Sequence, residues 1–138
     1  MAQLATTKTV YTVSDFLGWQ RNGSLELKPT FQRREVWSAK AKSFLIDTIV
    51  RGLPIPIIFL RKRQDLTTLS SQLEVVDGQQ RLRTLFSFVD SSVLKDYHAA
   101  KDDFSVLDIH NHDIADVPFR KLPSSIQTDI LGYEISTH

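Results

Sequence analysis

Cysteine is absent from this chain of 138 residues. Its absence excludes a disulfide framework, a zinc–thiolate site and a cysteine nucleophile. A chain without cysteine fits a reducing compartment, so we expect the protein to be cytoplasmic.

Long hydrophobic runs are absent as well. The longest, Leu53 to Leu60, has eight residues and contains two prolines. A membrane-spanning helix needs about 20 apolar residues. The first residues also lack the basic and then apolar pattern of a signal peptide. We therefore expect no membrane partner.

Glycine is scarce, with five residues, and no heptad pattern persists, so collagen and coiled-coil architectures are excluded. A strong net charge is missing too: it is +1, with 41% hydrophobic residues. Disordered chains combine low hydrophobicity with high net charge, so we exclude disorder as the main state. The length then predicts a single domain over residues 1–138.

The small net charge conceals an uneven distribution along the chain. Residues 1–83 hold 13 Lys and Arg against 7 Asp and Glu, whereas residues 84–138 hold 4 against 9. A basic half indicates an anionic partner such as a nucleotide or a nucleic acid. The alternative is that the two halves neutralise each other in the folded domain, and charge alone does not decide between them.

Hydrophobic periodicity predicts four helices and four short strands. Apolar residues from Ala41 to Ile49, for example, follow the spacing of one buried helix face. The expected helices cover residues 14–22, 38–51, 79–89 and 123–131, and the expected strands cover 25–28, 57–60, 73–76 and 133–136. Residues 64–71 are polar and aperiodic, which predicts a loop, and residues 91–118 are turn-rich and not assigned. We expect an α+β domain with a small mixed sheet and packed helices.

The strand–turn–helix around Asp77 is the strongest candidate site. Residues 73–89 read LEVVDGQQRLRTLFSFV. The strand runs into Asp77 and Gly78, and the helix begins at once. The first amides of that helix, near Gln79 to Arg81, lack intrahelical acceptors and therefore suit an anion. Gly78 would let a ligand approach the backbone closely.

The side chains of the first helical turn favour such an anion. Arg81 and Arg83 oppose the helix macrodipole at a cost of about 0.3–1 kcal/mol each, and a bound phosphate would reverse that sign. Gln79 and Gln80 can add neutral donors to phosphate oxygens or a base edge. Asp77 can hold a divalent metal or orient a water molecule.

A purely structural interpretation of the same residues stays open. Asp-Gly is a common turn, Asp77 is a good N-cap, and Arg81 can pair with a distant carboxylate. The standard nucleotide-binding loops GxxxxGK[ST] and GxGxxG are absent from the chain.

A second basic element precedes the second helix. Residues 31–38 read FQRREVWS and place Gln32 and Arg33 just before the helix start. Arginine suits bidentate phosphate binding. Trp37 can stack on a base, but we favour a core position for it.

Residues 108–116 read DIHNHDIAD and suggest a metal site only at first sight. The candidate ligands would be His110, His112, Asp113 and Asp116. Nothing in the segment supplies the outer hydrogen bonds that orient metal ligands, so we interpret it as an exposed acidic loop.

Four strings together carry a resemblance to a known family: FQRREVWS, IDTIVRGLPIPIIFL, EVVDGQQRLRTLFSF and FRKLPSSIQTDILGYEIS. Over about residues 12–136 the chain resembles the N-terminal domain of GmrSD-type modification-dependent restriction enzymes. The resemblance implies a ParB/sulfiredoxin-like fold. It also implies that the domain is the N-terminal part of a longer protein. Family members commonly read DGQQRLTTL, and here Arg83 takes the first Thr position.

The resemblance further implies Mg²⁺-dependent binding and hydrolysis of a nucleoside triphosphate, centred on DGQQR. By this likeness the nucleotide-binding residues are Gln32, Arg33, Gly78, Gln79, Gln80 and Arg81. The catalytic residues are Asp77, Gln80 and Arg81, and Asp77 also holds the metal.

Two functions follow as expectations. The first is an NTP-hydrolysing regulatory domain of a restriction or phage-defence system that acts on modified DNA. The alternative is a DNA-binding module that senses modified double-stranded DNA without nucleotide turnover, which the basic first half of the chain supports. In either case the expected partner is a C-terminal nuclease domain or a nuclease subunit, and nuclease chemistry is not expected from this chain alone.

Overall fold

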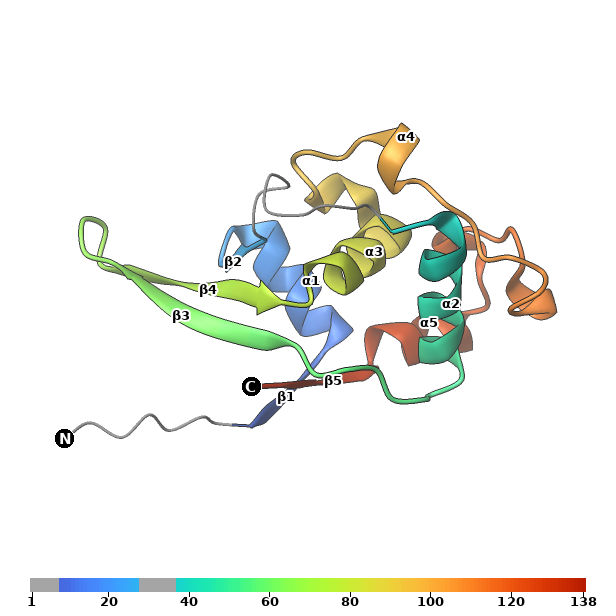
Figure 1. The fold of residues 1–138 in the computed structure, drawn as a ribbon, viewed down its shortest axis with the longest axis horizontal. Helices are drawn as coiled ribbons and strands as arrows, with labels where there is room; N and C mark the ends of the chain where they lie inside the picture. Colours follow the sequence, from blue (N-terminus) through green and yellow to red (C-terminus); the bar gives the residue numbers. More distant parts are fainter. Residues whose placement is uncertain (1–7, 28–36) are drawn as a thin grey trace.

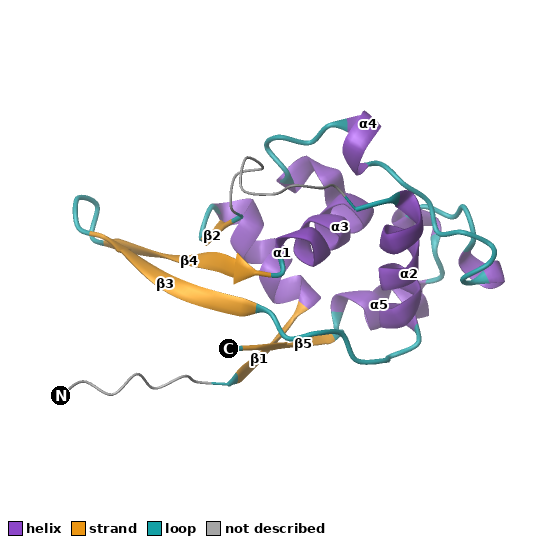
Figure 2. Ribbon diagram, in the orientation of Figure 1, coloured by secondary structure: helices purple, strands orange, loops and turns teal. Residues whose placement is uncertain are grey.

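The structure is a computed structural model that describes residues 8–27 and 37–138, and it confirms the expected α+β fold class. Figure 1 and Figure 2 show the helices packed together, with one pair of strands projecting beyond them. The strands are β1 (Thr9–Thr12), β2 (Leu25–Glu26), β3 (Phe59–Asp65), β4 (Ser70–Asp77) and β5 (Glu134–Thr137). The α-helices are α1 (Val13–Asn22), α2 (Ala39–Val50), α3 (Gln79–Asp90), α4 (Ala99–Asp102) and α5 (Ser124–Leu131). The short 3₁₀ helices are η2 (Ser91–Val93), η3 (His112–Ile114) and η4 (Phe119–Lys121).

The strands form two small sheets. β1 pairs with β5 in antiparallel fashion, with Thr9 opposite Thr137. The second sheet has the order β2-β4-β3, in which β4 is parallel to β2 and antiparallel to β3. Ile58, just before β3, forms an isolated parallel bridge with Thr137. This bridge ties the two sheets together beside the start of β3.

Side-chain caps explain where two of the helices begin. At the start of α1, the Thr12 hydroxyl accepts from the Asp15 amide at 3.1 Å, and the Asp15 carboxylate accepts from the Thr12 amide at 2.9 Å. This reciprocal capping box makes α1 begin directly after Thr12, slightly earlier than predicted. At the start of α2, the predicted N-cap Ser38 accepts from the Ala41 amide at 3.1 Å.

One hydrophobic core joins the helices to the sheets. Phe16 of α1, Ile46 of α2, Phe86 of α3 and Val75 of β4 are all fully buried in it. Trp37 is partly buried and packs against this core, as predicted. Because α3 contributes to the core and follows β4 directly, burial fixes the position of the strand–turn–helix.

The predicted loop over residues 64–71 is wrong. β3 continues to Asp65 and β4 begins at Ser70, so only residues 66–69 form the turn. The added strand residues are polar on both faces, and hydrophobic periodicity cannot detect such a strand. The backbone pairing that holds them is independent of side-chain polarity. We call residues 59–77 the β3–β4 ribbon.

Other boundaries differ less. β1 was not predicted, β2 is shorter than expected within the described residues, and β5 begins at Glu134. The unassigned stretch 91–118 contains η2, α4 and η3. Among residues 8–27 and 37–138, none of the helices combines the length and apolarity needed to cross a bilayer.

Candidate functional site

The predicted strand–turn–helix is present. β4 ends at Asp77, Gly78 is the N-cap, and α3 begins at Gln79. The Leu82 amide donates to the Gly78 carbonyl at 3.1 Å and is the first amide of α3 with an acceptor within the helix, so the amides of Gln79 to Arg81 have none there. The alternative role of Asp77 as N-cap is not observed, because the N-cap is a glycine without a side-chain acceptor. The start of α3 thus combines backbone donors with the positive end of the helix dipole.

The structure itself requires a glycine at position 78, apart from any ligand. Its φ of 114° lies in the left-handed region, which glycine adopts without steric cost. A β carbon at this position would lie 3.0 Å from Cγ1 of Ile58. Ile58 is fully buried, so it cannot move aside freely. The predicted close approach of a ligand to Gly78 stays a prediction.

Arg81 lies beneath the turn rather than on the surface. Its side chain is 10% exposed. The guanidinium donates to the carbonyl of Pro56, and both of its terminal nitrogens lie 3.4 Å from the carbonyl oxygen of Ile57. Burial lowers the pKa of Arg81, and the carboxylate of Asp77 opposes that change. Arg81 therefore ties α3 to the segment before β3, and direct phosphate binding by this side chain stays a prediction.

Asp77 is the exposed member of the site. Its side chain is 66% exposed, and Oδ2 lies 3.9 Å from Nη2 of Arg81. An ion pair at that distance and exposure is weak, so the carboxylate remains accessible from solvent. Magnesium typically takes one or two protein carboxylates together with phosphate oxygens and waters.

The surroundings of Asp77 bear on the kind of metal site it can form. Among the residues that the structure describes, no three acidic or histidine side chains gather as a metal cluster. A magnesium ion that arrives at Asp77 with a nucleotide stays a prediction.

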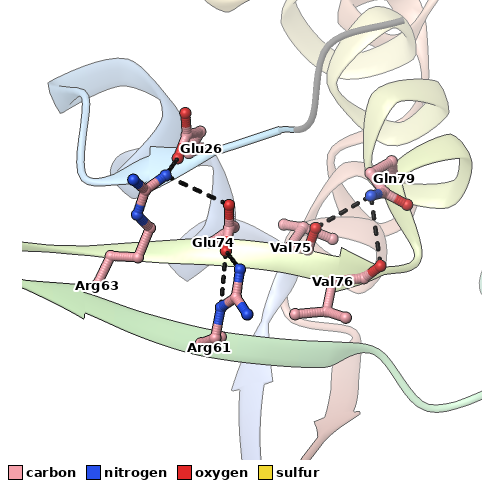
Figure 3. Close-up of polar contacts among 7 residues, drawn as sticks. All are labelled: Glu26, Arg61, Arg63, Glu74, Val75, Val76 and Gln79. Carbon is pink, nitrogen blue, oxygen red and sulfur yellow. Dashed lines mark hydrogen bonds and ion pairs between the residues drawn. The ribbon is translucent and has the colours of Figure 1, made fainter. Parts of the chain in front are cut away.

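The two glutamines of DGQQR occupy consecutive positions in the first turn of α3. Nε2 of Gln79 donates to the carbonyl oxygens of Val75 at 3.0 Å and Val76 at 3.4 Å, as Figure 3 shows. Gln79 thereby fastens the start of α3 to the end of β4. Gln80 is half-buried. Their contacts to a nucleotide remain predictions.

Arg83 stands where members of the resembling family commonly have the first Thr of DGQQRLTTL, and acidic residues neutralise its charge. Its Nε and Nη2 each lie 2.9 Å from one carboxylate oxygen of Asp102, and Nη1 lies 3.0 Å from Asp96. Hydrogen bonding to Asp102 raises the pKa of Arg83. Burial acts to raise the pKa of Asp102, but hydrogen bonds from Arg83 and the His98 amide hold it below its usual value. Arg83 therefore anchors the segment around α4 to α3 instead of adding free charge to the turn.

Sequence reasoning missed a buried carboxylate in the ribbon. Glu74 of β4 is fully buried, and Arg61 and Arg63 of β3 converge on it (Figure 3). Nε of Arg61 donates to Oε1 of Glu74 at 2.8 Å. Nη1 of Arg63 lies 3.4 Å from Oε2 of Glu74 and 3.1 Å from Oε1 of Glu26. In the antiparallel register Arg61 lies opposite Glu74. A predicted strand that continued past Leu60 would have pointed to this pair.

The remaining candidate residues lie apart from the turn or outside the description. Gln32 and Arg33 fall outside the described residues. Nδ1 of His110 lies 2.6 Å from the buried Ser43 hydroxyl, and His112 contacts Asp108. His110 therefore contacts α2, and His112 contacts a residue of its own segment.

Comparison with known protein families identifies the class of protein to which this chain belongs. A family model described as "GmrSD restriction endonuclease, N-terminal domain" matches residues 13–134, and the chain belongs to this family. The predicted resemblance is therefore confirmed, and with it a restriction or phage-defence context. No curated protein and no solved structure matches the chain.

Proposed function

We propose that this domain binds a nucleoside triphosphate at the start of α3 and hydrolyses it with Mg²⁺. It would do so as the regulatory part of a restriction or phage-defence system that acts on modified DNA. The observation that supports the proposal most is the β4–α3 turn, where the first amides of α3 follow directly on the exposed carboxylate of Asp77. A triphosphate supplies the negative charge that such a helix start favours, and it carries Mg²⁺ to a single carboxylate.

Each residue then has a distinct task. The backbone around Gly78 and Gln79 would hold phosphate oxygens, and Asp77 would hold the magnesium ion. The metal, when bound, supplies charge neutralisation on the phosphate. Gln80 would position the phosphate or the attacking water. Arg81 would act chiefly by positioning, because its guanidinium already donates to the carbonyls of Pro56 and Ile57.

Further proposed components lie outside the described site. Arg33 would neutralise phosphate charge from the segment before α2, and Gln32 would contact the nucleotide as a neutral hydrogen-bonding side chain. The expected partner is a C-terminal nuclease domain or a nuclease subunit. A restriction system acts on DNA within the cell, so we propose a cytoplasmic location.

Release of inorganic phosphate from ATP, GTP, CTP and UTP tests the proposal. With Mg²⁺ we expect release from at least one of the four, and none after chelation with EDTA. Asp77→Ala should lower the rate about a hundredfold, since a metal contact contributes several kcal/mol to phosphoryl chemistry. Asp113→Ala, which removes an exposed carboxylate from η3, should leave the rate unchanged. Equal rates in the wild type and Asp77→Ala would refute the assigned role.

A second candidate function is recognition of modified DNA without nucleotide turnover. The exposed β3–β4 ribbon, with Arg61, Lys62 and Arg63 on β3, favours it. Duplex binding that weakens steeply with salt, in a protein that releases no phosphate from any nucleotide, would favour this function over the first.

A further inference from the structure

The distal half of the β3–β4 ribbon contributes nothing to the hydrophobic core. Residues 61–64 and 66–72 are all exposed. Figure 1 shows this part of the ribbon extending beyond the helices along the longest axis of the molecule. A two-stranded ribbon is only marginally stable by itself, so a projecting one needs an anchor. Here the anchor is the buried carboxylate of Glu74, on which Arg61 and Arg63 converge.

The tip of the ribbon carries two exposed leucines. Leu66 and Leu69 are the first and last residues of the turn, and they are 82% and 81% exposed. Leu69 also adopts a φ of 60°, in the left-handed region that a leucine rarely occupies. Glycine or asparagine would relieve that strain, and a polar residue would suit the exposure. The tip therefore has an unfavourable local structure that contact with a ligand would offset.

The strands behind the tip are polar and rich in hydrogen-bond donors. β3 contributes Lys62, Arg63 and Gln64, and β4 contributes Ser70, Ser71 and Gln72. A recess of about 900 Å³ lies between this part of the ribbon and the turn after α1. Its walls include Asn22, Ser24, Arg63, Leu66, Ser70 and Gln72. The one cationic side chain among the lining residues, Arg63, pairs with the carboxylate of Glu26, which also lines the recess. A phosphodiester backbone fits such a polar wall better than an apolar protein segment does.

We propose that the β3–β4 ribbon is a DNA-binding arm that inserts into a groove of duplex DNA. Lys62 and Arg63 contact backbone phosphates, and Leu66 and Leu69 press against the bases as an apolar wedge. β-Ribbons of DNA-binding proteins enter the major or the minor groove, and leucine is one of the side chains that wedge between base steps from the minor groove. The two leucines are surrounded by polar residues, whereas a protein-docking face would be a continuous apolar patch. This inference rests on the DNA-directed part of the function proposed above and not on nucleotide hydrolysis.

Fluorescence anisotropy with a labelled mixed-sequence duplex of 24 base pairs tests the arm, with the whole chain titrated at several salt concentrations. Lys62→Ala should reduce the salt slope of log K by about 0.9, which corresponds to about eightfold weaker binding at 0.1 M salt than in the wild type. Leu66→Ser with Leu69→Asn should weaken binding about tenfold with an unchanged salt slope, because an apolar contact releases no counterions. Asparagine tolerates the left-handed region, so this double variant keeps the turn folded.

Two matched controls separate the arm from general surface effects. Lys121→Ala removes an exposed lysine from η4, and Ile109→Ser removes an apolar side chain from a residue that is 78% exposed and lies away from the ribbon. Both should bind the duplex like the wild type. The ribbon variants should also keep wild-type phosphate release without DNA, so failure of the arm and failure of the hydrolysis proposal are distinguishable. Wild-type DNA binding by the ribbon variants, or no DNA binding by the wild type, would overturn the inference.

Discussion

The side chain of Ile58 occupies the space that a β carbon on Gly78 would need, with Cγ1 at 3.0 Å from that position. Ile58 precedes β3, and Gly78 joins β4 to α3, so the contact locks the candidate turn against the strand beside it. The same turn also requires a positive φ. Packing and backbone conformation therefore both demand glycine in DGQQR, whether or not a ligand binds there.

Gly78→Ala should destabilise the domain by about 1–3 kcal/mol, because a left-handed backbone and a forced contact act together. Urea unfolding followed by circular dichroism measures the change. Gly18→Ala is the matched control: a β carbon there meets nothing within 4 Å, and the residue lies within α1. Helix propensity should make that variant more stable by about 0.5–1 kcal/mol. Equal stability of the two variants would contradict the structural role of Gly78.

Arg81→Ala should cost about 2–4 kcal/mol of stability, because it leaves the carbonyls of Pro56 and Ile57 without their donor and opens a cavity. Asp77→Asn should change stability by less than about 0.5 kcal/mol, since the ion pair it removes is long and exposed. Urea denaturation of the two variants beside the wild type makes the comparison. A larger loss for Asp77→Asn than for Arg81→Ala would show that the ion pair, and not the carbonyl contacts, holds α3.

Asp102 should make the domain sensitive to acid. Its pKa is lower in the folded state than in the unfolded chain, so the unfolded chain takes up the proton first as the pH falls. The contribution of Asp102 to stability is therefore complete above about pH 5 and is lost progressively as the pH falls from there through the lower pKa of the folded state. Urea unfolding at pH values from 3 to 7 should show this loss.

Asp102→Asn isolates that effect. It should cost about 3 kcal/mol at pH 7, because it leaves Arg83 buried without its main carboxylate, and it should flatten the acid limb of the stability curve. Asp103→Asn, which changes the exposed neighbour, should alter stability by less than about 0.5 kcal/mol. An acid limb in Asp102→Asn as steep as that of the wild type would assign the pH dependence to other carboxylates.

Thr12→Ala should destabilise the domain by about 1 kcal/mol, because it removes the hydroxyl that accepts from the Asp15 amide. Ser14→Ala lies in the same helical turn at an exposed position without a capping role, so it should change stability by less than about 0.5 kcal/mol. Thermal unfolding of both variants measures the difference. Indistinguishable melting temperatures would show that packing, and not the Thr12 cap, fixes the start of α1.

The four longer helices, α1, α2, α3 and α5, were predictable because their signals are local. Ser38 and the apolar spacing from Ala41 to Ile49 lie within one helix, and they predicted α2 nearly to the residue. β1 escaped prediction because its partner β5 lies about 128 residues further along the chain. The outer part of the ribbon, between the predicted strands 57–60 and 73–76, escaped because its strand residues are polar and show no hydrophobic alternation.

The candidate site was predictable in outline but not in its contacts. The letters DGQQR after an apolar run correctly predicted a strand that turns into a helix at Gly78. They could not reveal that the guanidinium of Arg81 donates to the carbonyl of Pro56, since that segment lies 25 residues earlier. They could not reveal the pairing of Arg83 with Asp102 either, because the partner lies in a stretch without periodicity.

The bridge between Ile58 and Thr137 links the turn at Gly78 to the order in which the domain folds. β1 and β5 meet only after a loop of about 128 residues has closed, and chain entropy opposes that closure until other contacts have formed. Such a pairing forms late and opens early, so its amides should exchange with deuterium before those of α3. Because Ile58 packs on Gly78 and is bridged to Thr137 of β5, opening of β5 would remove one of the contacts that hold the turn at the start of α3.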